Sequence, residues 1–400
     1  MKRTAVLILL LLPLSILFSS VPLIDDWTQN SYGYGEIGER FEITDVRMKG
    51  MGGAGLALSD PSNGLFVNPS SLAVGKFCFS YPALSLTVHH IHDAATRTSN
   101  GRSFIEMLFS GNYKDGEFYS ALLDMVSSER APLGKADIYT SFVTPYGLGL
   151  GLYASDTVFT YSGSVINETD SSFALGFGRG FTLGDFVLRA GAVMKFNYLI
   201  FSERMKANEI IGKKADKITT EFAYGYAFPV TDLAVTLSWR GISLSVVYKN
   251  LFSDYHMGVA ETALSEYLSV NTASLDYSLF KIENKGELDC GLGYEITLGD
   301  FGLSAAVDLN DLLTINDYDD NFSEPGRRLL KRFNTGFELE WRDILALRFG
   351  MNSGYFTLGT SLQYAGIKLE AAYYWEEKGT QAGERGLDAL SIRFNIGYEQ

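Results

Sequence analysis

The histidines and one acidic run are the first places to look for metal chemistry. His89, His90 and His92 form the run His-His-Ile-His, in which His90 and His92 would share one face of a strand. No Cys or Glu stands at ligand spacing, so this cluster indicates a solvated strand end rather than a metal site. The acidic run 316–321 lacks the central Gly and terminal Glu of a calcium loop and indicates an exposed loop. We expect no metal, no cofactor and no catalytic residue.

Two arginines could instead hold the headgroup of a ligand. Arg348 and Arg393 lie in C-terminal segments where apolar and polar residues alternate, and both stand on the polar face. A buried guanidinium can bind a carboxylate through paired hydrogen bonds, so both are candidate ligand-headgroup residues. The alternative is that they pair with Glu and Asp on neighbouring polar faces, and this alternative is favoured. Either role requires that the polar face of these segments lies inside the protein.

The elements that carry these arginines are five alternating segments between residues 333 and 398. Successive side chains of a strand point to opposite faces, so each segment has one apolar and one polar face. The links 342–343, 353–354 and 365–366 have the length of tight hairpin turns. This pattern predicts a meander of antiparallel strands. In the first segment, one face carries Phe333, Thr335, Phe337, Leu339 and Trp341.

Similar patterns recur upstream and give sixteen candidate strands in all. Short candidates can merge, so we predict about fourteen strands. Pro82 interrupts the first candidate and suits a bulge, a kink or an edge position. The eleven upstream candidates are 77–88, 136–143, 147–154, 157–163, 172–180, 185–200, 217–228, 232–239, 242–249, 287–297 and 301–310.

The alternation fits either a soluble sandwich or a membrane barrel, and other features favour the barrel. The C-terminal candidates run about ten to twelve residues, which suits a tilted crossing of a bilayer. Short turns alternate with longer connections. Trp239, Trp341 and Trp375 stand at strand ends, where an aromatic girdle meets lipid headgroups. We predict an all-β transmembrane antiparallel barrel; a soluble periplasmic or secreted β protein is the less favoured alternative.

The N-terminus predicts an exported chain, and the composition limits its partners. Lys2 and Arg3 precede the apolar run 5–18, so residues 1–20 are predicted to be a cleaved signal peptide. A net charge of −14 argues against nucleic-acid partners. Cys78 and Cys290 stand far apart within strand patterns and indicate no disulfide framework. Helical spacing within 104–128 predicts short amphipathic helices, and 203–216, 253–285 and 311–331 are expected to form loops or small helices at one rim.

The most distinctive stretch is Gly-rich and runs from residue 47 to residue 73. A phosphate-binding loop is not favoured, because the turn signal Asp60-Pro61 follows within a few residues. The stretch resembles the start of the FadL-type outer-membrane transporters and the related PorV-type barrels. The resemblance rests on the run Gly50–Ala54, on Asp60 and on Asn68-Pro69; Ser70 stands where the family usually has Ala. It covers the N-terminal segment well, while the remainder shares only barrel patterning.

The resemblance implies a domain organisation and a set of gating residues. Residues 21–75 would form a hatch inside the lumen, and residues 76–400 the barrel. A kink in an early strand opens the wall sideways in that family, which makes Pro82 the candidate wall kink here. The candidate hatch and gate residues are Gly50, Gly52, Gly53, Asp60, Asn68 and Pro69.

The resemblance also implies a function. We expect a bacterial outer-membrane barrel, surrounded by outer-membrane lipid, for passive uptake of hydrophobic small molecules such as long-chain fatty acids. No bond would be made or broken, so we do not expect an enzyme. The alternative is a PorV-like barrel that serves as a partner in protein secretion or surface attachment. A transporter needs an apolar pocket beside the hatch, whereas a secretion partner needs a closed lumen and an adhesive rim.

Overall fold

The computed structural model describes residues 45–399, apart from 59, 97, 100–101, 104–130, 162, 207–212, 253, 283–285, 315–324 and 380. The predicted signal peptide, residues 21–44 of the predicted hatch, the predicted helices within 104–128 and the acidic run 316–321 lie outside the described residues.

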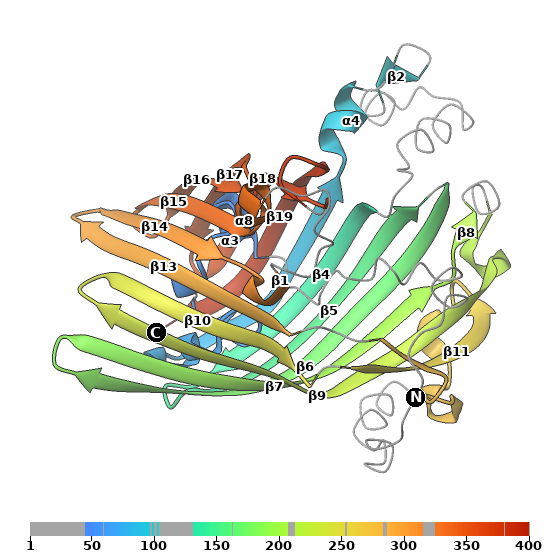
Figure 1. Cartoon of the computed structure of the whole chain (residues 1–400), viewed down its shortest axis with the longest axis horizontal. Coiled ribbons are helices and arrows are strands. Elements are labelled where there is room, and N and C mark those ends of the chain that lie inside the picture. Colours follow the sequence, from blue (N-terminus) through green and yellow to red (C-terminus); the bar gives the residue numbers. More distant parts are fainter. Residues whose placement is uncertain are drawn as a thin grey trace.

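Fourteen long strands of the described chain form a closed antiparallel barrel (Figure 1). The ring closes because β1 pairs with β4 on one side and with β19 on the other. The predicted barrel and its strand number are confirmed. In order around the barrel, the strands are β1 (Cys78–His89), β4 (Ala131–Val143), β5 (Leu148–Tyr161), β6 (Ser164–Leu183), β7 (Phe186–Ser202), β9 (Thr219–Trp239), β10 (Ile242–Leu251), β13 (Glu287–Leu298), β14 (Phe301–Leu309), β15 (Phe333–Trp341), β16 (Leu345–Asn352), β17 (Tyr355–Tyr364), β18 (Ile367–Glu377) and β19 (Gly386–Glu399).

Shorter elements complete the described chain. No helix in this part of the chain is long and apolar enough to span a membrane. The shorter helices, 3-10 helices and strands are α3 (Val46–Gly50), η3 (Leu56–Leu58), η4 (Pro69–Val74), α4 (Ile91–Thr96), β2 (Thr98–Ser99), β3 (Arg102–Ser103), β8 (Met205–Lys206), η5 (Ala215–Lys217), β11 (Tyr255–Ala263), η6 (Tyr267–Ser269), η7 (Thr272–Ser274), β12 (Phe280–Ile282), η8 (Leu312–Thr314) and α8 (Pro325–Arg332).

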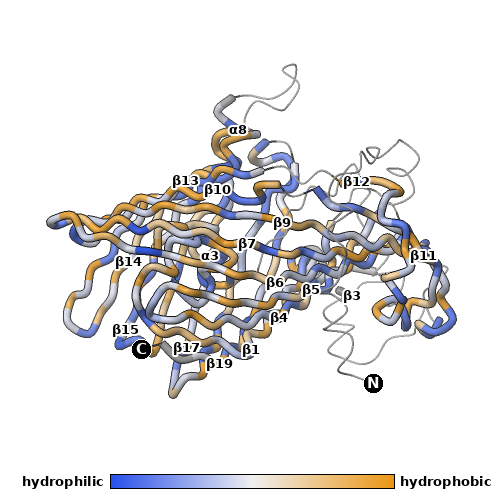
Figure 2. Tube along the Cα trace, turned by 90° about the horizontal axis from the view of Figure 1, so that it is seen from below, coloured by the Kyte–Doolittle hydropathy of each residue, from blue (hydrophilic) through white to orange (hydrophobic). Residues whose placement is uncertain are grey.

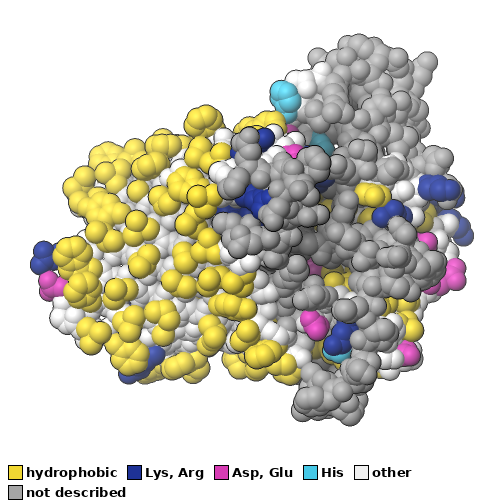
Figure 3. Space-filling model, viewed as in Figure 1, with side chains coloured by type: hydrophobic (Ala, Val, Ile, Leu, Met, Phe, Trp, Pro, Cys, Tyr) yellow, Lys and Arg dark blue, Asp and Glu magenta, His cyan; other side chains and the backbone are white. Residues whose placement is uncertain are grey.

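The apolar face of each strand lies outside. On β1, Leu84 and Leu86 are exposed, whereas the intervening Ser85 and the following Thr87 are buried. The same alternation of hydropathy repeats along the other strands (Figure 2), and hydrophobic side chains gather on the outer face (Figure 3). The intervening polar side chains are buried towards the lumen. An apolar belt of this extent on a closed barrel indicates contact with lipid. The Arg and Lys residues of the polar faces therefore point inward.

The two ends of the barrel differ in their connections. Tight turns join β4–β5, β6–β7, β9–β10, β13–β14, β15–β16 and β17–β18 at one end. Most longer connections lie at the other end. Outer-membrane barrels carry short turns on the periplasmic side and longer loops outside, so the two ends are the periplasmic and the extracellular end. β19 ends on the periplasmic side.

The same contact occurs twice at the periplasmic rim: an arginine lies over a tryptophan ring and forms an ion pair with an aspartate of the preceding hairpin. Arg240 lies 5.4 Å from the ring centre of Trp239 and pairs with Asp185 of the preceding hairpin at 2.9 Å. Arg342 repeats the arrangement: 5.4 Å from the ring of Trp341 and 2.8 Å from Asp300. These tryptophans are half-exposed at strand ends, where an aromatic ring meets the membrane surface.

In two places, two neighbouring candidate strands form one continuous strand in the structure. The sixteen candidates therefore become fourteen strands. Candidates 147–154 and 157–163 are both part of β5, because the inward Ser155 continues the alternation as a buried polar residue. Candidates 217–228 and 232–239 are both part of β9. There the pairing with β7 shifts by one residue between Lys195 and Asn197, so a bulge absorbs the break at Phe228-Pro229.

The predicted loop 253–285 is wrong in part, because it contains β11 and β12. β11 pairs with the extracellular half of β9, and β12 pairs with β11. The inward side chains of these strands are apolar, whereas His256 and Lys281 lie on the outward face, which is the reverse of the pattern on the transmembrane strands. β6, β7 and β9 have 20, 17 and 21 residues. Since about 9–11 residues cross a bilayer, these three strands extend the wall beyond the membrane on the extracellular side (Figure 1).

Candidate functional site

Residues 45–75, here called the lumen segment, lie inside the barrel. α3 contacts β16 to β19, η3 contacts β10, β13 and β14, and η4 contacts β6, β7 and β9. The polar partners of the segment are side chains of the inner wall, so it crosses the lumen from one side to the other. It contains the predicted residues Gly50, Gly52, Gly53, Asp60, Asn68 and Pro69.

The Gly-rich run lies directly against the wall. A Cβ on Gly50 would stand 2.9 Å from the Cα of Gly359 on β17. A Cβ on Gly52 would stand 2.5 Å from the backbone nitrogen of Met351, and the φ of Gly52 is +71°. Gly53 also has a positive φ and faces the Asn334 side chain. Backbone can approach backbone this closely only where no side chain intervenes.

Hydrogen bonds fix the segment to several strands. The Asp308 carboxylate of β14 accepts the amide hydrogens of Gly55 and Leu56, both at 2.8 Å. The Thr357 hydroxyl of β17 donates to the carbonyl of Gly50 at 3.0 Å. On the opposite wall, the hydroxyls of Ser70 and Thr236 are 2.6 Å apart. The segment is therefore anchored at both sides of the lumen.

Asn68 and Pro69 begin the turn of η4. The Asn68 amide oxygen accepts the backbone N–H of Ser70 at 3.1 Å, and the amide nitrogen donates to the Leu56 carbonyl at 2.8 Å. Pro69 occupies the first position of η4, where its missing N–H leaves no bond unmade. Asp60 accepts the backbone N–H of Ser62 at 2.5 Å. These residues thus shape the lumen segment itself.

An ion-pair network covers the inner face of β15, β16, β18 and β19. Glu338 accepts from Arg47 of the lumen segment at 2.7 Å and also pairs with Arg348. Although burial opposes its charged form, Arg47 has a raised pKa because the Glu338 carboxylate lies beside it. Glu370 stands 3.6 Å from Arg348 and 3.9 Å from Arg393. Predicted headgroup residue Arg348 is thus held between two wall carboxylates.

Predicted headgroup residue Arg393 contacts side chains of β1 and β4. Its Nε donates to Ser85 at 3.1 Å, and its guanidinium lies 5.1 Å from the ring centre of Tyr139. Within the described residues its Nη2 makes no hydrogen bond, although the side chain is only 3% exposed. The other predicted headgroup residue, Arg348, likewise has one guanidinium nitrogen, Nη1, without a hydrogen-bond partner in the described residues.

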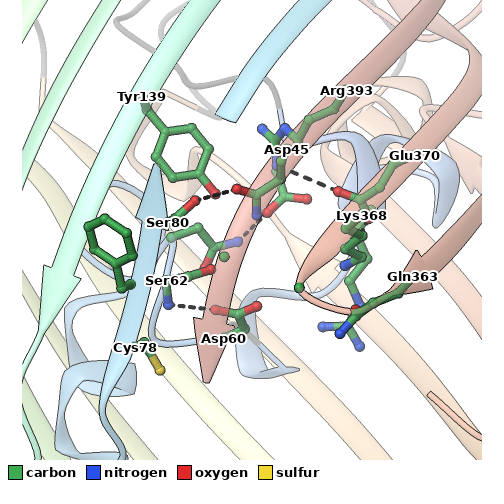
Figure 4. Close-up of a pocket in the computed structure, with 16 residues that line it drawn as sticks. Asp45, Asp60, Ser62, Cys78, Ser80, Tyr139, Gln363, Lys368, Glu370 and Arg393 are labelled. Carbon is green, nitrogen blue, oxygen red and sulfur yellow. Dashed lines mark hydrogen bonds and ion pairs between the residues drawn. The ribbon is translucent and has the colours of Figure 1, made fainter. Parts of the chain in front are cut away.

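Two cavities flank the lumen segment, and Asp45 lines both. The extracellular cavity, of about 260 Å³, is lined by charged residues that include Lys249, Asp289 and Glu376. The periplasmic cavity, of about 100 Å³, lies between Asp60 of the segment and Arg393 of β19 (Figure 4). The lumen segment therefore lies between a polar cavity on the extracellular side and a polar cavity on the periplasmic side.

The wall beside the periplasmic cavity is irregular at Pro82. The pairing of β1 shifts between Ser80 and Ala83, with β4 on one side and with β19 on the other. Ser80 and Cys78 line the cavity on its β1 side (Figure 4). The wall bulge and the cavity therefore lie next to each other.

The inner wall becomes apolar towards the extracellular end of β7, β9, β11 and β12. Below this region, Lys195 and Asp232 form a buried inward pair at 2.7 Å. The interior of a transmembrane barrel is ordinarily polar, so the apolar inner face found here differs from the usual pattern. We call this surface the upper apolar wall; it comprises Leu199, Phe201, Ala223, Ala227, Val230, Tyr255, Met257, Phe280 and Ile282.

Sequence reasoning found the Gly-rich run but missed its partners. The alternating pattern puts Asp308 and Glu338 on polar faces but does not identify their contacts, because their partners are 253 and 291 residues away in the chain. Phe66 and the wall tyrosines Tyr139 and Tyr153 were not singled out. Their ring centres lie 6.5 Å and 6.0 Å from that of Phe66. The one signal available was an aromatic residue on the polar face of two neighbouring strands.

Comparisons with known proteins give likenesses of fold. No protein-family model matches the sequence, and no curated protein matches it. A FadL homologue of Pseudomonas aeruginosa is 12% identical, with 90% of this chain and 99% of that chain covered and a TM-score of 0.42. The toluene transporter TodX of Pseudomonas putida is 10% identical over 90% and 98%, with a TM-score of 0.44. The monoaromatic hydrocarbon channel CymD is 11% identical over 88% and 96%, with a TM-score of 0.43.

The closed barrel and its apolar outer belt place the chain in the bacterial outer membrane. The solved structures that it resembles in fold include a FadL homologue and a toluene transporter.

Proposed function

We propose that the protein lets small hydrophobic molecules pass the outer membrane without chemical change, with the lumen segment as the gate. The ligand enters at the extracellular end, reaches the lumen segment, and passes when that segment moves. This function depends on an entry surface, a path and a gate.

The upper apolar wall is the observation that carries the proposal. Met257 on β11 and Phe280 on β12 point inward and are buried together with Leu199 on β7. These side chains pack on one another and are shielded from water, so an apolar ligand would enter by parting them and would itself be buried there. A surface of this kind can hold an apolar ligand at the mouth of the barrel.

The lumen segment makes apolar contacts with the β4–β7 side of the lumen, and the inward Lys195–Asp232 pair lies between these contacts and the upper apolar wall. Along β4 to β7, Leu65, Phe66 and Leu72 of the lumen segment pack on Tyr153 and Val193 of the inner wall. The charged network lies on the other half of the lumen, along β15 to β19. A hydrophobic molecule would therefore follow the β4–β7 side.

The geometry favours release towards the periplasm rather than sideways into lipid. A sideways exit at Pro82 would pass the periplasmic cavity, whose lining includes Asp45, Glu370 and Arg393. Charged walls disfavour a lipid-like path but are suited to a water-filled vestibule. In our proposal the bulge at Pro82 therefore gives the lower wall room to adapt, and the ligand leaves below the lumen segment.

A long-chain fatty acid is the less favoured cargo among hydrophobic molecules. Its carboxylate would have to bind Arg393 or Arg348, the predicted headgroup residues, each of which has one unused donor. Arg393 already interacts electrostatically with Asp45, Asp137 and Glu370. An incoming carboxylate would compete with these like charges, so an uncharged ligand fits this lumen better.

The test compares two neighbouring residues of β12 that point to opposite faces. Phe280 belongs to the upper apolar wall, whereas Lys281 points outward. Cells that express the chain, or either variant, are given labelled p-xylene, and its initial uptake is measured. F280N should lower uptake about tenfold or more, because a polar amide replaces an apolar ring at the entry. The matched K281N barrel should keep wild-type uptake.

Each outcome has a clear meaning once folding is checked by heat-dependent electrophoretic mobility. Unchanged uptake by folded F280N would refute the entry surface. Uptake no greater than that of cells without the protein would refute passage altogether. In that case a second protein that co-purifies in stable proportion would favour the secretion-partner alternative.

A further inference from the structure

An aromatic side chain of the lumen segment fills a slot between two wall tyrosines. Tyr139 on β4 and Tyr153 on β5 are partners in the strand register and both point inward. The ring of Phe66 lies 6.5 Å from Tyr139 and 6.0 Å from Tyr153, measured between ring centres. These spacings are those of attractive aromatic pairs. We call this arrangement the aromatic slot.

A pair of hydrogen-bond acceptors lies directly above the slot. Asp137 and Ser155 are register partners, each two residues further towards the extracellular end than Tyr139 and Tyr153. Both side chains are only 4% exposed. The Ser155 hydroxyl interacts with the Tyr153 hydroxyl beside it. Within the described part of the chain, however, neither carboxylate oxygen of Asp137 has a hydrogen-bond partner. Buried polar atoms are normally paired, so these atoms indicate a site for a missing donor.

The surrounding charges decide what kind of donor fits. Lys135 lies two residues further along the same face of β4, and Arg393 lies on β19. Both interact electrostatically with the Asp137 carboxylate. The negative charge is thus already balanced by two cations, although neither is hydrogen-bonded to it. An ammonium group would meet like charges, whereas a neutral hydroxyl can donate to Asp137 without this penalty.

We propose that the aromatic slot, with Asp137 and Ser155 above it, is a binding site for a phenol. In the closed barrel Phe66 occupies the place of the ligand ring. When the turn that carries Phe66 withdraws, the ring of the phenol takes its place and the phenolic hydroxyl donates to Asp137. This inference rests on the proposed function and narrows it from hydrophobic molecules to aromatic ones that carry a hydroxyl group.

The movement required of Phe66 is local. Its backbone N–H and that of Val67 donate to the carbonyl of Asn63 at 2.9 Å and 3.0 Å, so a single turn presents the ring. Truncation at Phe66 therefore empties the slot without removing any of the anchors at Asp308 or Thr357. An apolar cavity made in this way can bind an aromatic molecule of matching size.

The experiment uses the full barrel in amphipol and two probes of nearly equal shape, p-cresol and p-xylene, which differ by a hydroxyl in place of a methyl group. Binding to wild type, F66A, F66A/D137A and F66A/T87V is measured by calorimetry. Thr87 is a buried inward residue of β1 whose hydroxyl pairs with Ser391 at 2.6 Å, so T87V is a matched change of a polar lumen residue outside the slot.

We expect F66A to bind p-cresol about tenfold tighter than wild type does, and about tenfold tighter than F66A binds p-xylene. That preference should persist in F66A/T87V and disappear in F66A/D137A, because a hydrogen bond to a charged group is lost. A preference that survives in folded F66A/D137A would overturn the assignment of Asp137. Equal binding of both probes by F66A would overturn the phenol site alone and leave hydrophobic uptake intact. If folded F66A binds neither probe and F280N takes up p-xylene like wild type, both proposals fail.

Discussion

Removing the Asp308 carboxylate should loosen the lumen segment from the barrel wall. Asp308 is 1% exposed, and one of its oxygens accepts the N–H groups of Gly55 and Leu56 at 2.8 Å each. A hydrogen bond to a charged group contributes about 1.5–3 kcal/mol, so D308A should destabilise the bound segment by roughly 3–6 kcal/mol. Since about 1.4 kcal/mol is a factor of ten, the detached population should rise by roughly a hundredfold or more.

Hydrogen–deuterium exchange of the purified barrel measures this population directly. Gly55 and Leu56 should exchange much faster in D308A, because their amides no longer donate to the wall. Asp289 offers a matched control. It is equally buried on the neighbouring strand β13, but it accepts the N–H of Asp311 at 2.8 Å and pairs with Lys249 at 2.7 Å. D289A should therefore affect the extracellular rim and leave exchange in the lumen segment unchanged.

The reasoning fails if folded D308A protects these two amides as well as wild type does. It also fails if D289A exposes them to the same degree, since the effect would then come from any missing inward carboxylate. D308N gives a graded check. Its amide oxygen can still accept but carries no charge, so its exchange rate should lie between those of wild type and D308A.

Two further changes test the other contacts of the lumen segment by the same exchange measurement. G52A should detach the segment strongly, because its Cβ would stand 2.5 Å from the backbone nitrogen of Met351 at a φ of +71°; protection equal to wild type would show that the close approach does not hold the segment. R47A should have a smaller effect than D308A, because Glu338 keeps its partner Arg348 after Arg47 is removed. An effect as large as that of D308A would show that the Arg47 pair is the main anchor.

The fold could be predicted from the sequence because its information is local. Alternation along each strand and tight turns between strands fix which face is apolar, and a closed barrel repeats this rule fourteen times. The prediction failed where the rule failed. In β11 and β12 the inward Met257 and Phe280 are apolar while the outward Lys281 is charged, so the polarity of the two faces is the reverse of that in the transmembrane strands.

The candidate site could be predicted only in part, because its contacts join distant residues. The glycines of the run Gly50–Ala54 signalled a close approach, but the sequence does not name the surface they approach. That surface is Gly359 and Met351, and it follows from the register of β15, β16 and β17. Likewise, the polar face of β19 identified Arg393 as inward. Its distance from Glu370 depends on how β18 and β19 are aligned.

The anchors of the lumen segment differ in what they leave behind when broken, and this difference suggests how a ligand would act on the gate. Withdrawal of Arg47 leaves Glu338 paired with Arg348, so the charged side of the lumen gives up the segment at small cost. Withdrawal of Phe66 leaves the aromatic slot empty, which is costly unless another ring fills it. A ligand that binds the slot only when Phe66 is absent shifts the population towards the withdrawn state by its whole binding free energy. Under this proposal the cargo itself opens the gate, and Asp308 sets how much binding energy is required.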